Sequence, residues 1–345
     1  MKTKPFGHLS DKTPVQLFIL KNDKLEIAVT DYGTSLVNLI VNDKHGNPVD
    51  IALGYDDAPG YENDNGCYLG CNVGRNANRI RNGRFFLGDR EYLLDKNDGR
   101  NNLHSGLHPY SKRIWAVEKY NDDSVTFFLK SPHMDQGFPG EVIFHVTYRL
   151  LEDAAFQIQY EAVPDRDTII NMTNHSYFNL NGEGSGSALQ HKLTLHADSF
   201  TSADAESIPT GEMAAVINTP MDFRMGKTIG QDMEEAYEQL ILAKGYDHNY
   251  VLNRQKEGCR TVAEVLGDKT GITMQIATDY PGMQLYSANY LDNVRGKNGH
   301  IYGRRDALCF EPQFFPDAIN HENFASSVCR AGETYKKEII YRFFS

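Results

Sequence analysis

Cysteine is scarce in this chain, and its few cysteines form no pattern that indicates disulfides or a metal site. Five cysteines occur in 345 residues, an odd and small number for this length. Such usage is typical of free thiols in a reducing compartment, so we expect a cytoplasmic protein. Cys67 and Cys71 are four residues apart, but no second pair of ligands follows nearby at zinc-site spacing. We therefore expect no metal.

Long hydrophobic runs are also missing. The N-terminal lysines are not followed by an apolar segment of the kind found in signal peptides. No stretch approaches the ~20 apolar residues that a membrane-spanning helix needs. The sequence therefore predicts neither a signal peptide nor a transmembrane helix.

Positive charge is in short supply. Lysine and arginine total 35 against 46 aspartates and glutamates, which gives a formal charge of -11. Such a surface repels the phosphates of nucleic acids and of anionic membranes. We expect neither as a partner, and a neutral small molecule suits this balance better.

Common motifs of nucleotide binding and serine hydrolysis are absent as well. No glycine-rich loop ends in Gly-Lys-Ser/Thr, and the glycines at 182, 184 and 186 do not lead into a helical pattern. No Gly-x-Ser-x-Gly sequence occurs. Nucleotide cofactors and this kind of hydrolase are therefore not supported.

Alternating apolar and polar residues dominate the rest of the chain. Strand-like runs recur every ~10 to 15 residues with turn residues between them, and the clearest are 25–29, 35–41, 85–87, 91–94, 115–120, 124–129, 142–151 and 154–163. Their alternation is typical of antiparallel strands with one face on the core. With 40% hydrophobic residues and no Pro- or Ser-rich linker, the pattern predicts an all-β sandwich or barrel in one domain, residues 1–345.

Helices are expected to be few and short. The best candidate is 232–242, where apolar residues fall at helical spacing. Lys244 and Gly245 would end it with a basic residue and a glycine cap.

Polar clusters stand beside the ends of strand-like runs, at 74–80, 101–106, 174–180, 245–250 and 309–313. The central one, Asn-His-Ser-Tyr-Phe-Asn-Leu at 174–180, follows a β-branched run at 168–173 and precedes a glycine-rich segment at 182–187. The first reads as a strand and the second as a loop. Taken alone, His175 fits a buried histidine in a local polar network as well as it fits a catalytic histidine.

Glu311 is the acidic residue that fits a purely structural role least. It lies in an apolar run, where a carboxyl needs a partner or a raised pKa. Arg79, His104 and Asp247 each have ordinary explanations as surface or turn residues. A histidine and a carboxyl that meet in one cleft would make a general acid and a general base.

Together these clusters resemble the aldose 1-epimerase (galactose mutarotase) family, nearly from end to end. The resemblance rests mainly on the motif at 174–180, on Tyr-Asp-His-Asn-Tyr at 246–250, and on Glu-Pro-Gln at 311–313 with Phe-Pro-Asp-Ala at 315–318. It implies a large antiparallel β-sandwich, often called a supersandwich, with a sugar in an open cleft and no cofactor.

The resemblance also implies site residues. It makes His175 the general acid and Glu311 the general base of sugar ring opening, with His175 as an imidazolium and Glu311 as a carboxylate. It further implies sugar contacts by Asn78, Arg79, His104, Ser176, Tyr177, Asp247 and Gln284. The chain departs from the family at 104–106, where His-Ser-Gly replaces the usual His-Gly-Gly, and this bears on loop shape and sugar preference.

The implied activity is interconversion of the α and β anomers of a neutral hexose such as D-glucose or D-galactose, by a monomer or homodimer. Two alternatives remain at this point. A non-catalytic sugar-binding protein of the same fold would be expected to lack the histidine or the glutamate. A phosphosugar 1-epimerase would be expected to carry a basic cluster near Asp247, and the sequence shows none.

Overall fold

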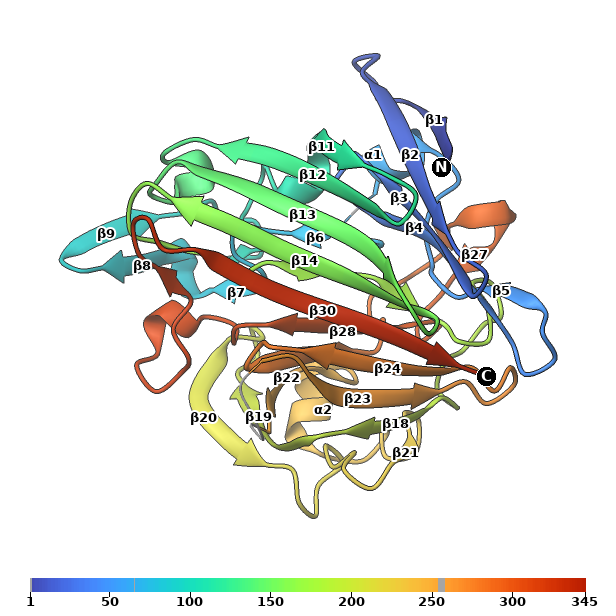
Figure 1. The fold of residues 1–345 in the computed structure, drawn as a ribbon. Helices are drawn as coiled ribbons and strands as arrows, with labels where there is room; N and C mark the ends of the chain where they lie inside the picture. Colours follow the sequence, from blue (N-terminus) through green and yellow to red (C-terminus); the bar gives the residue numbers. More distant parts are fainter. Residues whose placement is uncertain (1, 65, 254–257) are drawn as a thin grey trace.

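A large antiparallel sheet dominates the computed structural model, which describes residues 2–64, 66–253 and 258–345 (Figure 1). This nine-stranded sheet has the order β11 (Ala116–Tyr120), β12 (Ser124–Ser131), β13 (Val142–Leu151), β14 (Ala155–Pro164), β30 (Tyr335–Phe344), β24 (Thr273–Thr278), β23 (Arg260–Leu266), β18 (Lys192–Leu195) and β21 (Lys227–Thr228). The C-terminal strand β30 pairs with β14 on one side and β24 on the other. It therefore joins strands from the two halves of the chain.

The longest hairpin of this sheet follows directly from the sequence pattern. β13 and β14 pair along ten residues each, from Val142 opposite Pro164 to Leu151 opposite Ala155. Val146, Tyr148 and Ile158 are buried, whereas Arg149, which follows Tyr148 on β13, is exposed. Alternate side chains of a strand point to opposite faces, so one face covers the core and the other meets solvent.

A second sheet lies behind the first and carries the candidate site. Its six strands run in the order β17 (Tyr177–Phe178), β28 (Leu308–Gln313), β25 (Gly282–Tyr286), β22 (Asp247–Leu252), β19 (Ala197–Ala203) and β20 (Pro209–Ala215). The two sheets touch where the rings of Phe178 and Tyr341 lie 5.2 Å apart. The main hydrophobic core contains side chains of both sheets, so the predicted all-β sandwich is confirmed.

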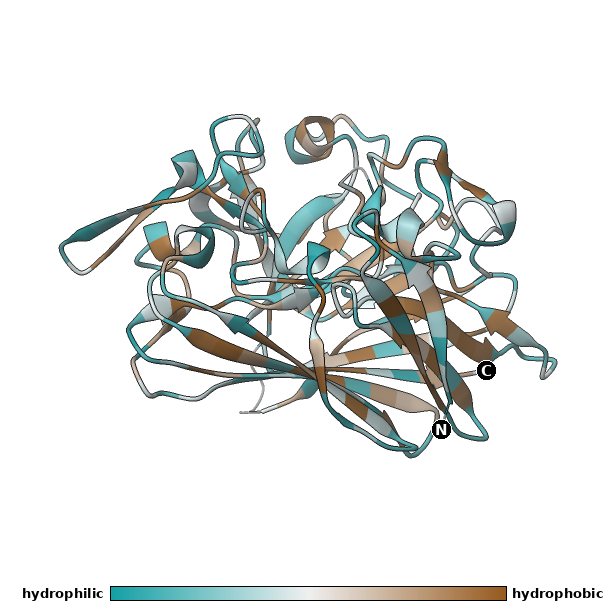
Figure 2. Cartoon of the chain, turned by 90° about the horizontal axis from the view of Figure 1, so that it is seen from above, coloured by the Kyte–Doolittle hydropathy of each residue, from teal (hydrophilic) through white to brown (hydrophobic). Residues whose placement is uncertain are grey.

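The N-terminal strands form a sheet of their own with the order β1 (Lys2–His8), β2 (Pro14–Lys21), β3 (Leu25–Thr30), β4 (Leu36–Asn42) and β5 (Pro48–Asp50). Five short antiparallel pairs complete the described strands: β6 (Asn72–Val73) with β16 (Thr173–Asn174), β7 (Arg79–Ile80) with β10 (Asn102–Leu103), β8 (Arg84–Leu87) with β9 (Arg90–Leu93), β15 (Thr168–Ile169) with β29 (Val328–Cys329), and β26 (Val294–Arg295) with β27 (Ile301–Tyr302). Figure 2 shows hydrophobic colour mainly along strands and hydrophilic colour in many connecting loops.

The described part of the chain contains two short α-helices, α1 (Ala58–Glu62) and α2 (Glu238–Ala243). The helix predicted at 232–242 is therefore wrong at its start and correct near its end. Tyr237, an extended residue without a side-chain cap, precedes α2, while Lys244 adopts a left-handed φ of 57° at its end. Gly245 follows with φ of 132°. In the described residues no helix is long and apolar enough to cross a membrane.

The composition of the run at 168–173 predicted a single strand, and this prediction is wrong. Thr168–Ile169 pairs with β29, whereas Thr173–Asn174 pairs with β6. The chain therefore changes partners within six residues, which β-branched composition does not reveal. The segment at 182–187 is a loop, as expected.

Candidate active site

One face of the six-stranded sheet gathers much of the candidate site. Glu311 lies opposite Gln284 across the β25–β28 pair, and Asp247 lies opposite Tyr286 across β22–β25. Directly opposed residues, and residues two apart on a strand, share a face of the sheet. The register β17–β28, with Tyr177 opposite Cys309, brings Tyr177 to the same face. These four strands therefore place a carboxyl pair, an amide and two tyrosines together.

His175 lies just before β17 and is held through its backbone. Its N–H donates to the Cys71 carbonyl at 2.8 Å, and its carbonyl accepts from the Gly70 N–H at 3.0 Å. These bonds bring the imidazole to Glu311, where His175 Nε2 lies 3.7 Å from Glu311 Oε1. The two side chains are 8% and 3% exposed. An imidazole and a carboxyl thus meet in a nearly dry environment.

Two tyrosine rings enclose the imidazole of His175. Tyr177 stacks with it at a centroid distance of 5.2 Å and 26°, and Tyr68 does so at 5.8 Å and 28°. Tyr68 also packs edge-on against His104 at 4.7 Å. Among the described residues, His175 Nδ1 has no hydrogen-bond partner and neither does Glu311 Oε2. The plane of the imidazole is therefore set by ring packing and by the backbone.

The opposite wall comes from the short β7–β10 pair and its flanks: Arg79 begins β7, Asn78 precedes it, and His104 follows β10. The backbone N–H of Asn78 donates to His104 Nδ1 at 3.1 Å. Because Nδ1 accepts, a neutral His104 carries its proton on Nε2 and is a hydrogen-bond donor there. Arg79 Nε donates to Asp98 Oδ2 at 2.7 Å, which fixes its guanidinium.

Three residues that line the pocket have strained backbone conformations. Tyr68, Asn78 and His104 have φ of 59°, 63° and 51°, a left-handed conformation that non-glycine residues seldom adopt. Such conformations persist where the surrounding contacts impose them, and they cluster at functional sites. Ser105, the residue after His104, has φ of 72°. Its hydroxyl accepts from the Asn76 N–H at 2.8 Å, so the loop accommodates serine by an added hydrogen bond.

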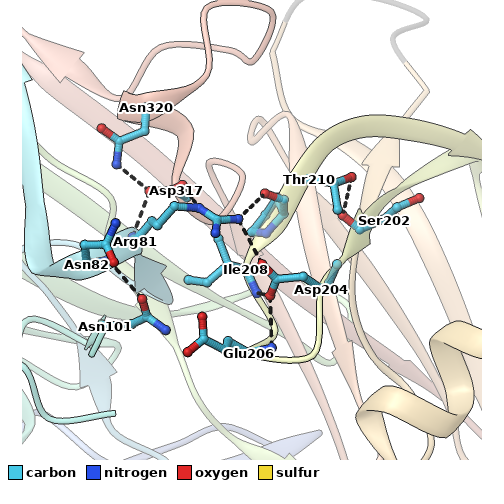
Figure 3. A network of polar contacts seen from close by, with 12 residues as sticks. Arg81, Asn82, Asn101, Ser202, Asp204, Glu206, Ile208, Thr210, Asp317 and Asn320 are labelled. Carbon is cyan, nitrogen blue, oxygen red and sulfur yellow. Dashed lines mark hydrogen bonds and ion pairs between the residues drawn. The ribbon is translucent and has the colours of Figure 1, made fainter. Parts of the chain in front are cut away.

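A polar network around Arg81 adjoins the strand end that carries Arg79, and Figure 3 shows Arg81 with Asp204 and Asp317. The Arg81 N–H donates to Asp317 Oδ1 at 3.0 Å, and Arg81 Nη2 donates to Asp204 Oδ2 at 3.0 Å. The Asp317 N–H in turn donates to the Arg79 carbonyl at 2.8 Å. The strand end that carries Arg79 is therefore tied to the segments around Asp204 and Asp317.

These walls enclose an open pocket. Its lining includes seven predicted site residues: Asn78, Arg79, His104, His175, Tyr177, Asp247 and Glu311. Five other lining residues were not predicted: Gly66, Tyr68, Leu103, Tyr286 and Tyr290. Tyrosine faces beside hydrogen-bonding groups suit a ligand that has both apolar and hydroxyl-bearing surfaces.

Ser176 and Gln284 do not line this pocket. Ser176 is 1% exposed, and its hydroxyl donates to Asn174 Oδ1 at 2.6 Å. Gln284 Nε2 donates to Asp247 Oδ1 at 2.7 Å. Gln284 therefore orients Asp247 from outside the pocket, whereas Ser176 bonds to Asn174, the residue before His175.

Burial shifts the proton affinities of the central pair in opposite directions. It lowers the pKa of His175 to about 4. It raises the pKa of Glu311 well above its usual value, and the negative charge of Asp247 adds to that shift while Arg79 opposes it. Burial thus favours neutral His175 and protonated Glu311, whereas the sequence led us to expect an imidazolium and a carboxylate.

Burial also acts on the neighbouring groups. It lowers the pKa of His104 well below its usual value, with His175 and Arg79 acting in the same direction. His104 is therefore a neutral donor at pH 7. Burial raises the pKa of Asp247, an effect that Arg79 and the Gln284 hydrogen bond oppose. In the described residues, no group of three or more His, Cys, Asp or Glu side chains is placed to hold a metal ion.

The fold and this pocket define a β-sandwich protein with a buried imidazole–carboxyl pair in a tyrosine-lined cleft. The family model for aldose 1-epimerase matches residues 16–342. The chain therefore belongs to the aldose 1-epimerase family.

Individual relatives agree with this assignment. Galactose mutarotase of Mus musculus is 36% identical over 98% of this chain and 97% of its own length. Aldose 1-epimerase of Escherichia coli is 33% identical over 96% of this chain and 96% of its own length. The structure of an aldose epimerase homologue from C. elegans has a TM-score of 0.89 at 32% identity, covering 95% of this chain and 98% of the other. The structure of galactose 1-epimerase from Lactobacillus acidophilus has a TM-score of 0.85 at 26% identity, and the match covers 100% of this chain and 99% of the other.

Proposed function

We propose that this protein is a mutarotase that interconverts the α and β anomers of a neutral hexose such as D-glucose or D-galactose. The observation that carries the proposal is the His175–Glu311 pair, two buried groups 3.7 Å apart in a pocket of hydrogen-bonding side chains. Anomers interconvert by proton transfers at two neighbouring oxygens, and a paired acid and base can serve both.

In the proposed reaction Glu311 accepts the proton of the C1 hydroxyl while His175 protonates the ring oxygen. The bond between C1 and the ring oxygen breaks, and C1 becomes an aldehyde carbon. Rotation about the C1–C2 bond then presents the other face of the aldehyde. In the return step the C5 hydroxyl attacks C1 and gives its proton to His175, while Glu311 returns a proton to O1. The pair ends with the protons it had at the start.

The pKa shifts fit this cycle. Ring opening turns an imidazolium and a carboxylate into a neutral imidazole and a carboxylic acid. That neutral pair is the one that burial favours, because burial lowers the pKa of His175 and raises that of Glu311. Burial therefore assists both proton transfers of ring opening. Sugar binding must supply the free energy that forms the charged pair.

The other pocket groups are proposed to hold the sugar. Neutral His104 would donate from Nε2 to an oxygen near C1, and Arg79, fixed by Asp98, would donate to another oxygen. Asp247, oriented by Gln284, would accept from sugar hydroxyls. Asn78 and Tyr177 complete the contacts. We further propose that residues 1–345 form one domain, working in the cytoplasm as a monomer or homodimer.

Polarimetry of freshly dissolved α-D-glucose and α-D-galactose tests the function. We expect the protein to accelerate mutarotation of either or both sugars, and Glu311→Gln to lower kcat by a factor of ~10² or more, because the substitution removes the base. Glu322→Gln, at an exposed site, is the matched control.

Three outcomes separate the alternatives. Sugar binding without acceleration by the unaltered protein would show a binding protein. Acceleration of the 6-phosphate alone would show a phosphosugar epimerase. Near-normal kcat in Glu311→Gln would contradict the assigned role of the carboxyl.

A further inference from the structure

The motif Phe-Pro-Asp-Ala at 315–318 follows closely on Glu311, but its residues do not line the pocket. Phe315 and Ala318 pack with Phe324 in a small hydrophobic cluster. Between them Asp317 adopts a left-handed φ of 55° and is 1% exposed. A buried carboxyl is costly unless it makes hydrogen bonds. Its partners therefore indicate what the motif does.

Asp317 bonds to the backbone of β7 on both sides of Ile80. Its N–H donates to the Arg79 carbonyl at 2.8 Å, and its Oδ1 accepts from the Arg81 N–H at 3.0 Å. Backbone groups of successive strand residues point to opposite edges, and β7 uses its other edge for β10, where Ile80 lies opposite Asn102. Asp317 therefore takes the place of a neighbouring strand beside Arg79.

The carboxyl of Asp317 is itself held in place. Asn320 Nδ2 donates to its Oδ1 at 2.6 Å (Figure 3). Its Oδ2 lies 3.3 Å from His321 Nε2 and 4.0 Å from Arg81 Nε. These contacts keep Oδ1 facing the Arg81 N–H.

Arg79 is thus fixed at two points. Its side chain, 15% exposed, is held by Asp98 at 2.7 Å, and its backbone is held by Asp317. Asp317 is six residues after Glu311. One short stretch of chain therefore carries the proposed base on one wall of the pocket and holds Arg79 on the opposite wall. The charge of Arg79 opposes the rise in the pKa of Glu311, so the placement of one bears on the other.

We propose that Asp317 is a positioning residue for sugar binding, which sets the place of Arg79 relative to Glu311 through its backbone N–H and its carboxyl. The proposal rests on the proposed mutarotase function and on the sugar contact assigned there to Arg79. Without the carboxyl, β7 would shift and the guanidinium would lose its alignment with the sugar. Binding would weaken, while proton transfer by His175 and Glu311 would continue.

A double-mutant cycle with Arg79 tests whether Asp317 acts through it. Asp317→Gly removes the carboxyl, and glycine accepts the left-handed φ without strain. Isothermal titration calorimetry with D-glucose and D-galactose gives Kd, and polarimetry gives kcat and KM. Asp317→Gly should weaken binding and raise KM about tenfold, with a smaller effect on kcat. In an Arg79→Met background the same substitution should change Kd less than twofold, because no guanidinium remains to be placed.

Two further variants separate this role from a merely structural one. Asp317→Asn keeps an acceptor oxygen and tolerates the left-handed conformation, so it should bind sugar within about twofold of the parent. Asp153→Gly is the matched control, since Asp153 is an exposed aspartate with φ of 60° in the β13–β14 turn. It should leave Kd and kcat unchanged.

A milder variant serves if Asp317→Gly does not fold. Asn320 is exposed, and Asn320→Ala removes one of the bonds that orient the same carboxyl. It should weaken binding about threefold when Arg79 is present and leave Kd unchanged in Arg79→Met.

The proposal is overturned if Asp317→Gly, or Asn320→Ala in its place, binds sugar as the parent does. Equal weakening with and without the Arg79 guanidinium would also overturn it, as would binding by Asp317→Asn as weak as that of Asp317→Gly. Parent-like binding by Arg79→Met would overturn it while leaving the proposed function intact. Failure of the unaltered protein to bind or turn over any aldose would instead overturn the proposed function.

Discussion

His175 should make this protein sensitive to acid, and His175→Gln should remove that part of the sensitivity. Burial lowers the pKa of His175 to about 4, whereas an unfolded histidine titrates near ~6.5. Between these values the unfolded chain binds a proton at this position that the folded chain does not bind. The free energy of unfolding therefore falls as the pH drops from about 6.5 to 4.

The size of the effect follows from the two pKa values. Relative to neutral pH, the lost stability is roughly 2 kcal/mol at pH 5 and roughly 3 kcal/mol at pH 4, because one pKa unit corresponds to ~1.36 kcal/mol. Burial raises the pKa of Glu311, so its protonated carboxyl offers no negative charge to an imidazolium in acid. The cation gains little compensation from its neighbour.

Urea unfolding followed by circular dichroism, at pH 7, 6, 5 and 4, measures the effect. The stability of His175→Gln relative to the parent should rise by roughly 3 kcal/mol between pH 7 and pH 4. His104 and His248, whose pKa values burial also lowers, remain in both proteins and largely cancel. His45→Gln, at an exposed position, is the control and should follow the parent. A constant difference between His175→Gln and the parent across this range would refute the reasoning.

Three further predictions concern two residues of the pocket and one arginine buried elsewhere. Tyr68→Leu should lower kcat about tenfold and move the acid limb of the pH profile, because the His175 imidazole loses the ring that stacks on it. Tyr68→Phe keeps that ring and should leave both properties as in the parent. Asp247→Asn should raise KM about tenfold with a smaller effect on kcat, since it loses a charge-assisted bond to the sugar; unchanged KM would contradict that role. Arg75 is fully buried and donates to the Pro139 and Gly140 carbonyls and the Ser131 hydroxyl. Arg75→Met should therefore lower the free energy of unfolding by about 3 kcal/mol or more, measured against exposed Arg84→Met.

Strand prediction from the sequence succeeded where pairing is long and failed where it is short. The run at 142–151 matches β13 residue for residue, because ten alternating residues present one face to a single long partner. At 168–173 each strand is two residues long, and its partner lies far away in the sequence. Which backbone accepts such a short segment depends on tertiary packing, so no local pattern could have shown the break.

The candidate site shows the same division. Histidine, glutamate and arginine stand out in polar clusters, and the structure brings His175, Glu311 and Arg79 to one pocket. Tyr68, Tyr286 and Tyr290 did not stand out, because the chain has 19 tyrosines and many of them are buried in the core. Proximity to His175, rather than residue type or local sequence, distinguishes Tyr68 from the others.

Ionisation is the property that the sequence alone predicted least well, and the reason is physical. Reference pKa values make His175 an acid and Glu311 a carboxylate near neutral pH, but both groups are almost completely removed from water. Desolvation penalises each charge, so the resting pair is driven toward the neutral form that the mechanism reaches only on ring opening. A sugar that donates to Glu311 and accepts from His175 would restore the charged form by replacing the lost water. The pocket therefore stabilises the neutral protonation state that ring opening produces. The hydrogen bonds of a bound sugar would stabilise the charged His175 and Glu311 that must form first.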